Sequence, residues 1–99
     1  MDSERHFLYI ITNKNNTVLY IGITNNLKRR MSQHRRKVHP KTFSARYNLC
    51  KLIYFESFSS KKEALKRERQ MKKWNRAWKI ELIEKENPEW KDLIKEIKV

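Results

Sequence analysis

Residues 7–34, FLYIITNKNNTVLYIGITNNLKRRMSQH, decide the fold of this 99-residue chain. Residues 7–12 and 18–23 are apolar runs rich in Tyr, Ile, Phe and Val, a composition typical of β-strands. The polar residues 13–17 between them predict a turn, because Asn tolerates the positive φ that tight hairpin turns need. The stretch therefore begins with a predicted β-hairpin.

The register of this hairpin brings two tyrosines together. If residues 15–16 form the turn, Ile11 lies opposite Tyr20, and Tyr9 lies opposite Gly22. The two tyrosines then share one face of the sheet on a diagonal that lets their side chains meet. A glycine weakens a strand unless something must approach the backbone closely. We therefore expect a site here, in addition to a core.

A predicted helix from Leu27 onward adds a cation to that site. Leu27 and Met31 are spaced as one buried stripe, and Arg30 and His34 follow Leu27 by three and seven positions. Both side chains therefore lie on or beside the stripe. An arginine at the edge of a core is unfavourable unless it has a partner or a function.

The order of these residues resembles the GIY-YIG nuclease family. Tyr20-Ile21-Gly22 matches the second signature element, and Arg30 and His34 follow it on the helix. The first element reads Phe7-Leu8-Tyr9, so its tyrosine is kept and its glycine is not. Residues 7–90 look like the small stand-alone bacterial subfamily, which resembles the N-terminal nuclease domain of an excision-repair nuclease. The later matching elements are Arg46-Tyr47, residues 52–56, residues 67–74 and residues 87–90.

Length and composition predict one domain, residues 1–99. Cys50 is the only cysteine, which rules out an internal disulfide and suggests a cytoplasmic protein. One cysteine and three scattered histidines do not make a zinc site. No apolar run approaches 18 residues, and the N-terminus does not read as a signal peptide, so we expect no membrane association.

Charge points to a polyanionic partner. The chain carries 24 Lys and Arg against 11 Asp and Glu, a net charge of +13. Residues 5–55 contain eleven basic residues and no acid, whereas residues 80–99 contain six acids and four bases. A positive field concentrated in one part of a chain is typical of nucleic-acid binding.

The rest of the chain completes an α/β (α+β) fold, a three-stranded antiparallel sheet flanked by helices. Residues 50–57 predict the third strand, with alternating side chains on its two faces. Residues 61–75 predict a helix, and the amphipathic pattern continues to residue 86. Predicted helix caps are Thr24 or Asn25, Ser59 or Ser60, and Asn87, the last with Pro88 as the first helical residue.

Glu68 lies in the apolar stripe of the helix over residues 61–75, whereas Glu63 lies on a different, exposed face. A carboxylate in such a stripe needs a partner. That partner is either an arginine such as Arg30 or a divalent metal, which prefers oxygen ligands. The residues alone leave both open; the resemblance implies the metal, because this family holds a single ion through one glutamate on this helix.

Other residues are candidates for nucleic-acid contacts. Arg46 could contact phosphate and Tyr47 stack on a base, or the pair could pack on the core. Cations and aromatics alternate around Trp74 and Trp78, so the two rings could stack on bases. Two tryptophans at this spacing are more often core residues or a helix-packing contact. The remaining nucleic-acid candidates are Gly22, Lys72 and Lys73, and the resemblance gives Asn87 a supporting role in the active site.

The resemblance implies a DNA endonuclease that depends on one Mg²⁺ or Mn²⁺ ion. Arg30 would bind the scissile phosphate, and Tyr9 or Tyr20 would take the proton of the attacking water. His34 is open to three roles, as the base instead, as a phosphate ligand or as a partner that orients another site residue, and equally to a structural place at the helix edge. A nearby cation would lower a tyrosine pKa from about 10. The alternatives are a nucleic-acid-binding module without catalysis and a structural protein of a ribonucleoprotein. Expected substrates include branched or damaged DNA, as in DNA repair, with a protein partner as one possible source of targeting.

Overall fold

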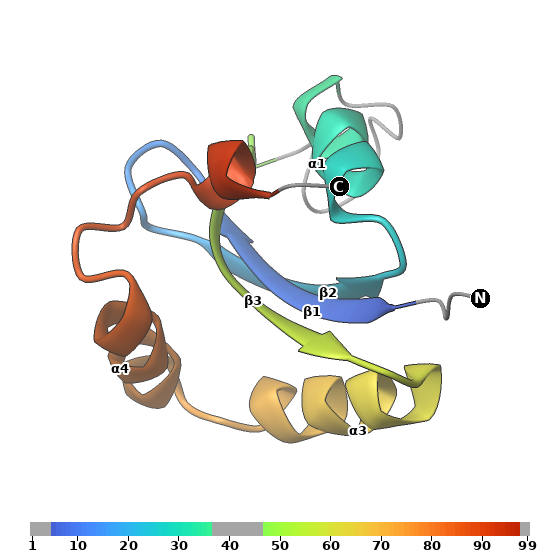
Figure 1. Ribbon diagram of the computed structural model, residues 1–99. Helices are drawn as coiled ribbons and strands as arrows, with labels where there is room; N and C mark the ends of the chain where they lie inside the picture. Colours follow the sequence, from blue (N-terminus) through green and yellow to red (C-terminus); the bar gives the residue numbers. More distant parts are fainter. Residues whose placement is uncertain (1–4, 37–46, 98–99) are drawn as a thin grey trace.

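The computed structural model describes residues 5–36 and 47–97, which build one antiparallel sheet with helices on both faces (Figure 1). The strands are β1 (His6–Thr12), β2 (Leu19–Thr24) and β3 (Lys51–Phe58), in the order β2-β1-β3. β1 pairs with both neighbours and is buried on both faces. The predicted fold class is confirmed.

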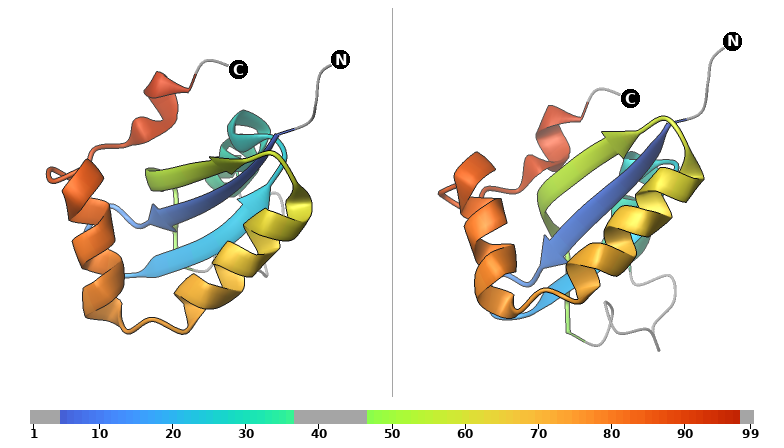
Figure 2. Two further views of the ribbon diagram at one scale, coloured as in Figure 1. Left: turned by 60° about the horizontal axis from the view of Figure 1, so that its bottom comes forward. Right: turned by 90° about the horizontal axis from the view of Figure 1, so that it is seen from below.

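The helices divide between the two faces. α1 (Leu27–Arg36) and the short 3₁₀ helix η1 (Leu93–Glu96) pack on one face, whereas α3 (Lys61–Lys72) and α4 (Arg76–Glu86) pack on the other. Figure 2 shows α3 running beside β2. Within the described residues, no helix is both long and apolar enough to cross a membrane.

The hairpin has the predicted register. Tyr9 pairs with Gly22 and Ile11 pairs with Tyr20. The ladder ends at the Thr12–Leu19 pair, so the connection is longer than a two-residue turn. Asn16 has a φ of 57°, the left-handed conformation expected of an asparagine in this turn.

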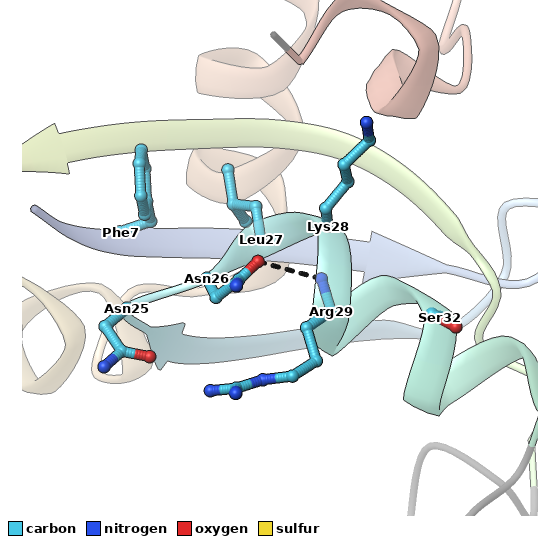
Figure 3. A pocket seen from close by; sticks show the side chains of 7 residues that line it. All are labelled: Phe7, Asn25, Asn26, Leu27, Lys28, Arg29 and Ser32. Carbon is cyan, nitrogen blue, oxygen red and sulfur yellow. Dashed lines mark hydrogen bonds between the residues drawn. The ribbon is translucent and has the colours of Figure 1, made fainter. Parts of the chain in front are cut away.

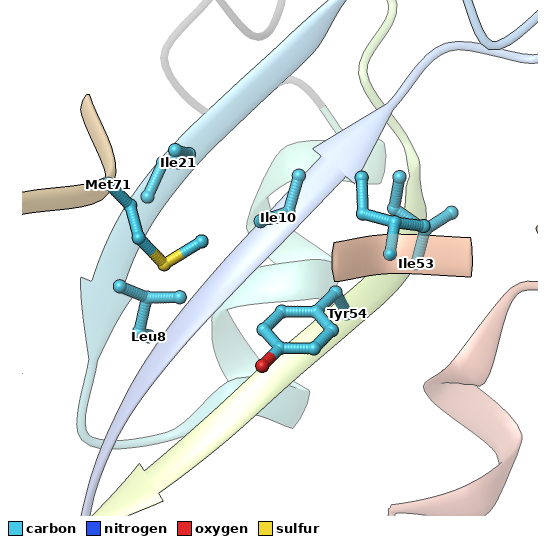
Figure 4. Close-up of a cluster of buried hydrophobic side chains, with 7 residues drawn as sticks. Leu8, Ile10, Ile21, Ile53, Tyr54 and Met71 are labelled. Carbon is cyan, nitrogen blue, oxygen red and sulfur yellow. The ribbon is translucent and has the colours of Figure 1, made fainter. Parts of the chain in front are cut away.

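The predicted alternation along the third strand is wrong at its centre. Ile10 pairs with Tyr54 and Ile11 with Leu52, so Ile53 is an extra residue in a β-bulge. Ile53 and Tyr54 therefore both belong to the core under α3 and α4 (Figure 4), whereas Leu52 belongs to the core under α1. A bulge is not visible in a period-two pattern, because the sequence shows no glycine or break there.

Two helix starts also differ from the prediction. Asn26, rather than Thr24 or Asn25, caps α1, since its Oδ1 accepts a hydrogen bond from the Arg29 amide at 3.0 Å. Ser60 caps α3 as predicted. The helix does not continue unbroken to residue 86, because Asn75 caps a new helix, α4.

The role of Asn87 is also different. It ends α4 instead of starting a helix, and the following 3₁₀ helix is capped by Asp92. The Asn87 side chain is 5% exposed; its Nδ2 donates to the carbonyls of Ile53 and Lys91, and its Oδ1 accepts from the Lys91 amide. N-capping thus does not explain Asn87: its side chain ties the C-terminal segment to the bulge of β3.

We predict that Asn87→Ala lowers the free energy of unfolding by about 1–3 kcal/mol, because the Ile53 carbonyl would lose its side-chain donor in the interior. Urea unfolding measures this effect. Glu86→Ala, at an exposed neighbouring position, should change stability by less than about 0.5 kcal/mol. Unchanged stability in Asn87→Ala would contradict this structural role.

Candidate active site

Two tyrosines meet above the single glycine of the chain. The ring centroids of Tyr9 and Tyr20 are 6.3 Å apart, as the predicted diagonal requires. A Cβ atom on Gly22 would lie 2.6 Å from the Tyr9 hydroxyl oxygen and 3.1 Å from the Tyr20 ring. Glycine is therefore needed because the phenol of Tyr9 occupies the space of a side chain at this position.

α1 adds an imidazole to the two phenols. Leu27 and Met31 are buried against Tyr9, which fixes the rotation of the helix. His34 then lies with its ring centroid 5.8 Å from that of Tyr9 and 6.1 Å from that of Tyr20. The Tyr9 hydroxyl and His34 Nε2 are 3.2 Å apart, within hydrogen-bond distance.

The ionisation of Tyr9 differs from expectation. Burial raises its pKa far above the ordinary value, Tyr20 and Glu68 raise it further, and only Arg30 lowers it. The predicted lowering by a cation is present but smaller than the effect of burial, because Tyr9 is only 1% exposed. Tyr9 is therefore a neutral phenol near neutral pH, and its hydroxyl stays within hydrogen-bond distance of His34 Nε2.

This raised pKa predicts a loss of stability in alkali. The unfolded chain releases the Tyr9 proton near pH 10, whereas the folded protein retains it, so the free energy of unfolding falls as the pH rises above about 10. Tyr54, whose pKa is raised by burial and by Glu56, adds to the same fall. Urea unfolding from pH 8 to 11 should show a weaker pH dependence for Tyr9→Phe. An unchanged dependence would contradict the raised pKa.

Arg30 and Glu68 approach Tyr9 from different helices. Arg30 is half-buried on α1, and Glu68 lies on α3 with its side chain 16% exposed. Both charges act on the pKa of Tyr9: Arg30 lowers it and Glu68 raises it. In the described part of the chain, the ion pair of Glu68 is made with Lys72, at 3.2 Å from Nζ to Oε2, rather than with Arg30.

The donor set fits a metal held by one carboxylate. Across residues 5–36 and 47–97, no group of three or more His, Cys, Asp or Glu side chains is placed to hold an ion. Glu68 supplies one hard oxygen donor, partly exposed and already neutralised by a cation. Mg²⁺ is often bound in this way, through one or two carboxylates, waters and substrate phosphates.

Other predicted site residues are not brought into this group. Arg46 lies outside the described residues. The Lys73 backbone ends α3, and Asn87 bonds Ile53 and Lys91. Tyr47 is 45% exposed, so it does not pack in the core.

The tryptophans have separate roles. Trp74 packs on the core, with the Arg67 guanidinium 5.2 Å from its ring centroid, as the helix-packing interpretation predicts. Trp78 is 55% exposed, so it is not a core residue, but it contacts Trp74 edge-on, which is the helix-packing contact that the prediction also allowed.

The sequence did not reveal a second polar cluster, which braces α3 against β3. Arg67 donates to both carboxylate oxygens of Glu56, from Nε at 3.0 Å and from Nη2 at 3.1 Å, and the Tyr54 hydroxyl donates to the same carboxylate. The sequence could not predict this cluster because it gives no sign of the bulge in β3, which places Tyr54 under α3. This brace holds the helix that carries Glu68.

A hollow of about 530 Å³ lies elsewhere on α1 (Figure 3). Its lining excludes both site tyrosines, Arg30, His34 and Glu68, so it is distinct from the candidate site. The lining residues are Phe7, Asn25, Asn26, Leu27, Lys28, Arg29 and Ser32.

Comparisons with known proteins identify the family of this chain. The GIY-YIG catalytic domain family matches residues 5–81. The UPF0213 protein SH2523 of Staphylococcus haemolyticus is 38% identical over 80 residues, which cover 81% of this chain and 95% of that protein. The UPF0213 protein CPE1444 of Clostridium perfringens is 37% identical over 92 residues, covering 93% of this chain and 97% of that protein.

A solved structure has the same fold. The solution NMR structure of the UPF0213 protein BH0048 from Bacillus halodurans aligns with a TM-score of 0.55 and 26% identity, covering 89% of this chain and 92% of that one. The family match includes both tyrosines, Arg30, His34 and Glu68. The chain therefore belongs to the GIY-YIG catalytic domain family, within the GIY-YIG nuclease superfamily.

Proposed function

We propose that the protein is a divalent-metal-dependent DNA endonuclease that hydrolyses phosphodiester bonds. The observation that carries this proposal is the grouping of two phenols and an imidazole beside one glycine, with an arginine and a carboxylate whose charges act on the buried phenol. The five side chains come from β1, β2, α1 and α3, so only the folded chain assembles them. The residues are Tyr9, Tyr20, Arg30, His34 and Glu68.

Proton transfer is assigned to Tyr9 and His34 acting as a pair. Burial keeps Tyr9 from ionising alone, but His34 Nε2 lies 3.2 Å from its hydroxyl and can accept that proton. The Tyr9 oxygen can then take a proton from the attacking water, leaving the charge on the imidazole, which accepts protons near neutral pH. Tyr20, which is half-buried, lines the approach to this pair.

Arg30 and a metal ion held by Glu68 would neutralise the negative charge of the phosphate. The planar guanidinium of Arg30 would bind two phosphate oxygens of the scissile group. Glu68 would hold a single Mg²⁺ or Mn²⁺, which when bound neutralises the phosphate and stabilises the leaving oxygen. Lys72 pairs with the Glu68 carboxylate and partly neutralises it.

A second candidate is a nucleic-acid-binding module without catalysis. The net charge of +13 and the exposed Trp78 favour it, because a basic surface and an exposed aromatic ring suffice for binding. It gives no role to the contact between Tyr9 and His34 or to the carboxylate of Glu68.

A cleavage assay separates the two candidates. Purified protein is incubated with supercoiled, single-stranded, branched and damaged DNA, each with Mg²⁺, Mn²⁺ or EDTA. Cutting with either metal but not with EDTA is expected, and the preferred DNA indicates whether a role in repair follows. Salt-sensitive binding of every DNA without cutting would contradict the nuclease and favour the binding module.

A further inference from the structure

Two hollows follow the free edge of β2, one on each side of the candidate active site. The first, of about 340 Å³, is lined by Leu19, Tyr20, Ile21, Lys72 and Lys79. The second, of about 440 Å³, is lined by His6, Ile23, Thr24, Asn25, Arg30, Lys61 and Leu65. Gly22, the glycine beneath Tyr9, stands between the β2 residues of the two hollows.

The residues along one face of α3 occur in the same order as the two hollows and the active site between them. Lys61, Leu65, Glu68 and Lys72 are spaced by four, three and four residues, which places them on one side of the helix. Lys61 and Leu65 line one hollow, Lys72 lines the other, and Glu68 lies between them. α3 runs beside β2 and contacts it (Figure 2). The edge of β2 and this face of α3 therefore form the two sides of one groove.

The charges of the groove suit a row of phosphates. The hollow at one end of the groove is lined by the basic residues Arg30 and Lys61 and by His6, and the hollow at the other end by Lys72 and Lys79. Neither lining contains an acidic residue. Glu68 is the carboxylate at the centre, and Lys72 Nζ reaches it at 3.2 Å, so this end of the groove adjoins the reaction centre directly.

The length of the groove and the open edge of β2 also suit the binding of one nucleic-acid strand. From Lys61 to Lys72 the helix rises about 16.5 Å, a length that spans more than one phosphate of a nucleic-acid strand. β2 is an edge strand within the described sheet, so its outer side presents backbone N–H groups that can donate to phosphate oxygens.

We propose that this groove binds a single nucleic-acid strand that crosses the active site, with a phosphate on each side of the scissile bond held by one of the two basic ends. The proposal rests on the proposed function for the central phosphate. It adds Lys61 and Lys79 as substrate-positioning residues, and it gives Lys72, already a candidate nucleic-acid contact, a place at one end of the groove. Lys62 and Lys66 lie exposed on other sides of α3 and take no part in it.

Binding is measured first, in EDTA, so that no cleavage is needed. Fluorescence anisotropy of a labelled single-stranded DNA gives the affinity of Lys61→Gln and of Lys72→Gln/Lys79→Gln, with Lys62→Gln/Lys66→Gln as the matched control. The groove variants should bind several-fold more weakly. Their slope of log K against log salt should fall by about 0.7 for each lysine removed. An equal loss of DNA affinity in the Lys62→Gln/Lys66→Gln control would contradict the proposed groove.

The position of each phosphate is then tested with uncharged methylphosphonates. A methylphosphonate on one side of the central phosphate should weaken binding to the wild type but not to the variant that lacks the facing lysine. If the methylphosphonate lowered the affinity of every variant as much as that of the wild type, the assignment of phosphates to these lysines would be wrong. These readouts do not depend on cleavage: if no DNA is cut with any metal, the proposed function fails while the anisotropy result still decides the groove.

Discussion

Glu68→Gln is expected to lower the rate of metal-dependent DNA cleavage by about 10²–10³-fold, the size of effect seen when one electrostatic contributor to a transition state is removed. Glutamine keeps the shape of the side chain but lacks the charge that holds a divalent ion. Stability should change little, because the ion pair of Glu68 with the 54% exposed Lys72 is worth only about 0.3–0.5 kcal/mol.

Single-turnover cleavage rates in Mg²⁺ and Mn²⁺, beside thermal unfolding curves, measure this effect. Glu63→Gln is the matched control, because Glu63 is exposed in the first turn of the same helix. DNA affinity in EDTA should be preserved in Glu68→Gln. Cleavage at the wild-type rate would remove Glu68 from the site.

Gly22→Ala is expected to destabilise the protein and to impair cleavage together. The new Cβ would lie 2.6 Å from the Tyr9 hydroxyl oxygen and 2.7 Å from its Cζ, so the ring must move. Such overpacking costs about 1–3 kcal/mol of folding free energy. The φ of Gly22 is not positive, so the effect is steric rather than a matter of backbone strain. Displacing Tyr9 also breaks its contact with His34, and cleavage should fall at least about tenfold.

A second-site variant tests this explanation. Leucine at position 9 is shorter than tyrosine and leaves room for the added methyl group, so Gly22→Ala/Tyr9→Leu should be more stable than the sum of the two single effects. Its cleavage should stay low, since the phenol is gone. Strictly additive losses in urea unfolding would show that the contact with Tyr9 is not the reason for glycine.

The sequence was most informative where one periodic pattern decides the geometry. A shift of one residue would exchange the two faces of the hairpin, so the apolar pattern and the asparagines of residues 13–16 together determine the observed pairing of Tyr9 with Gly22. The spacing of Leu27 and Met31 likewise orients α1, and with it Arg30 and His34.

It was least informative where tertiary packing decides. The bulge at Ile53 has no local signal, and it moves Tyr54 to the face covered by α3. Asn87-Pro88 carries every local sign of a helix start, yet the Asn87 amide is used to hold β3. The pKa of Tyr9 depends on burial, which a count of neighbouring charges does not reveal.

The groove is only partly visible in the sequence. Lys61, Leu65, Glu68 and Lys72 have the spacing of one helix face, so helical periodicity alone suffices to place the two lysines beside Glu68. Lys79 has no such signal, because its place beside β2 depends on the break at Asn75.

The most direct test of the central claim, that phosphodiester chemistry takes place where β1, β2, α1 and α3 meet, is an NMR titration of the labelled protein with Mn²⁺. The paramagnetic ion broadens the amide signals near its binding site. We predict selective broadening at Glu68, Gly22 and Arg30, and its loss in Glu68→Gln. Broadening centred instead on the acids of α4, Glu81, Glu84 and Glu86, and unchanged in Glu68→Gln, would contradict the account.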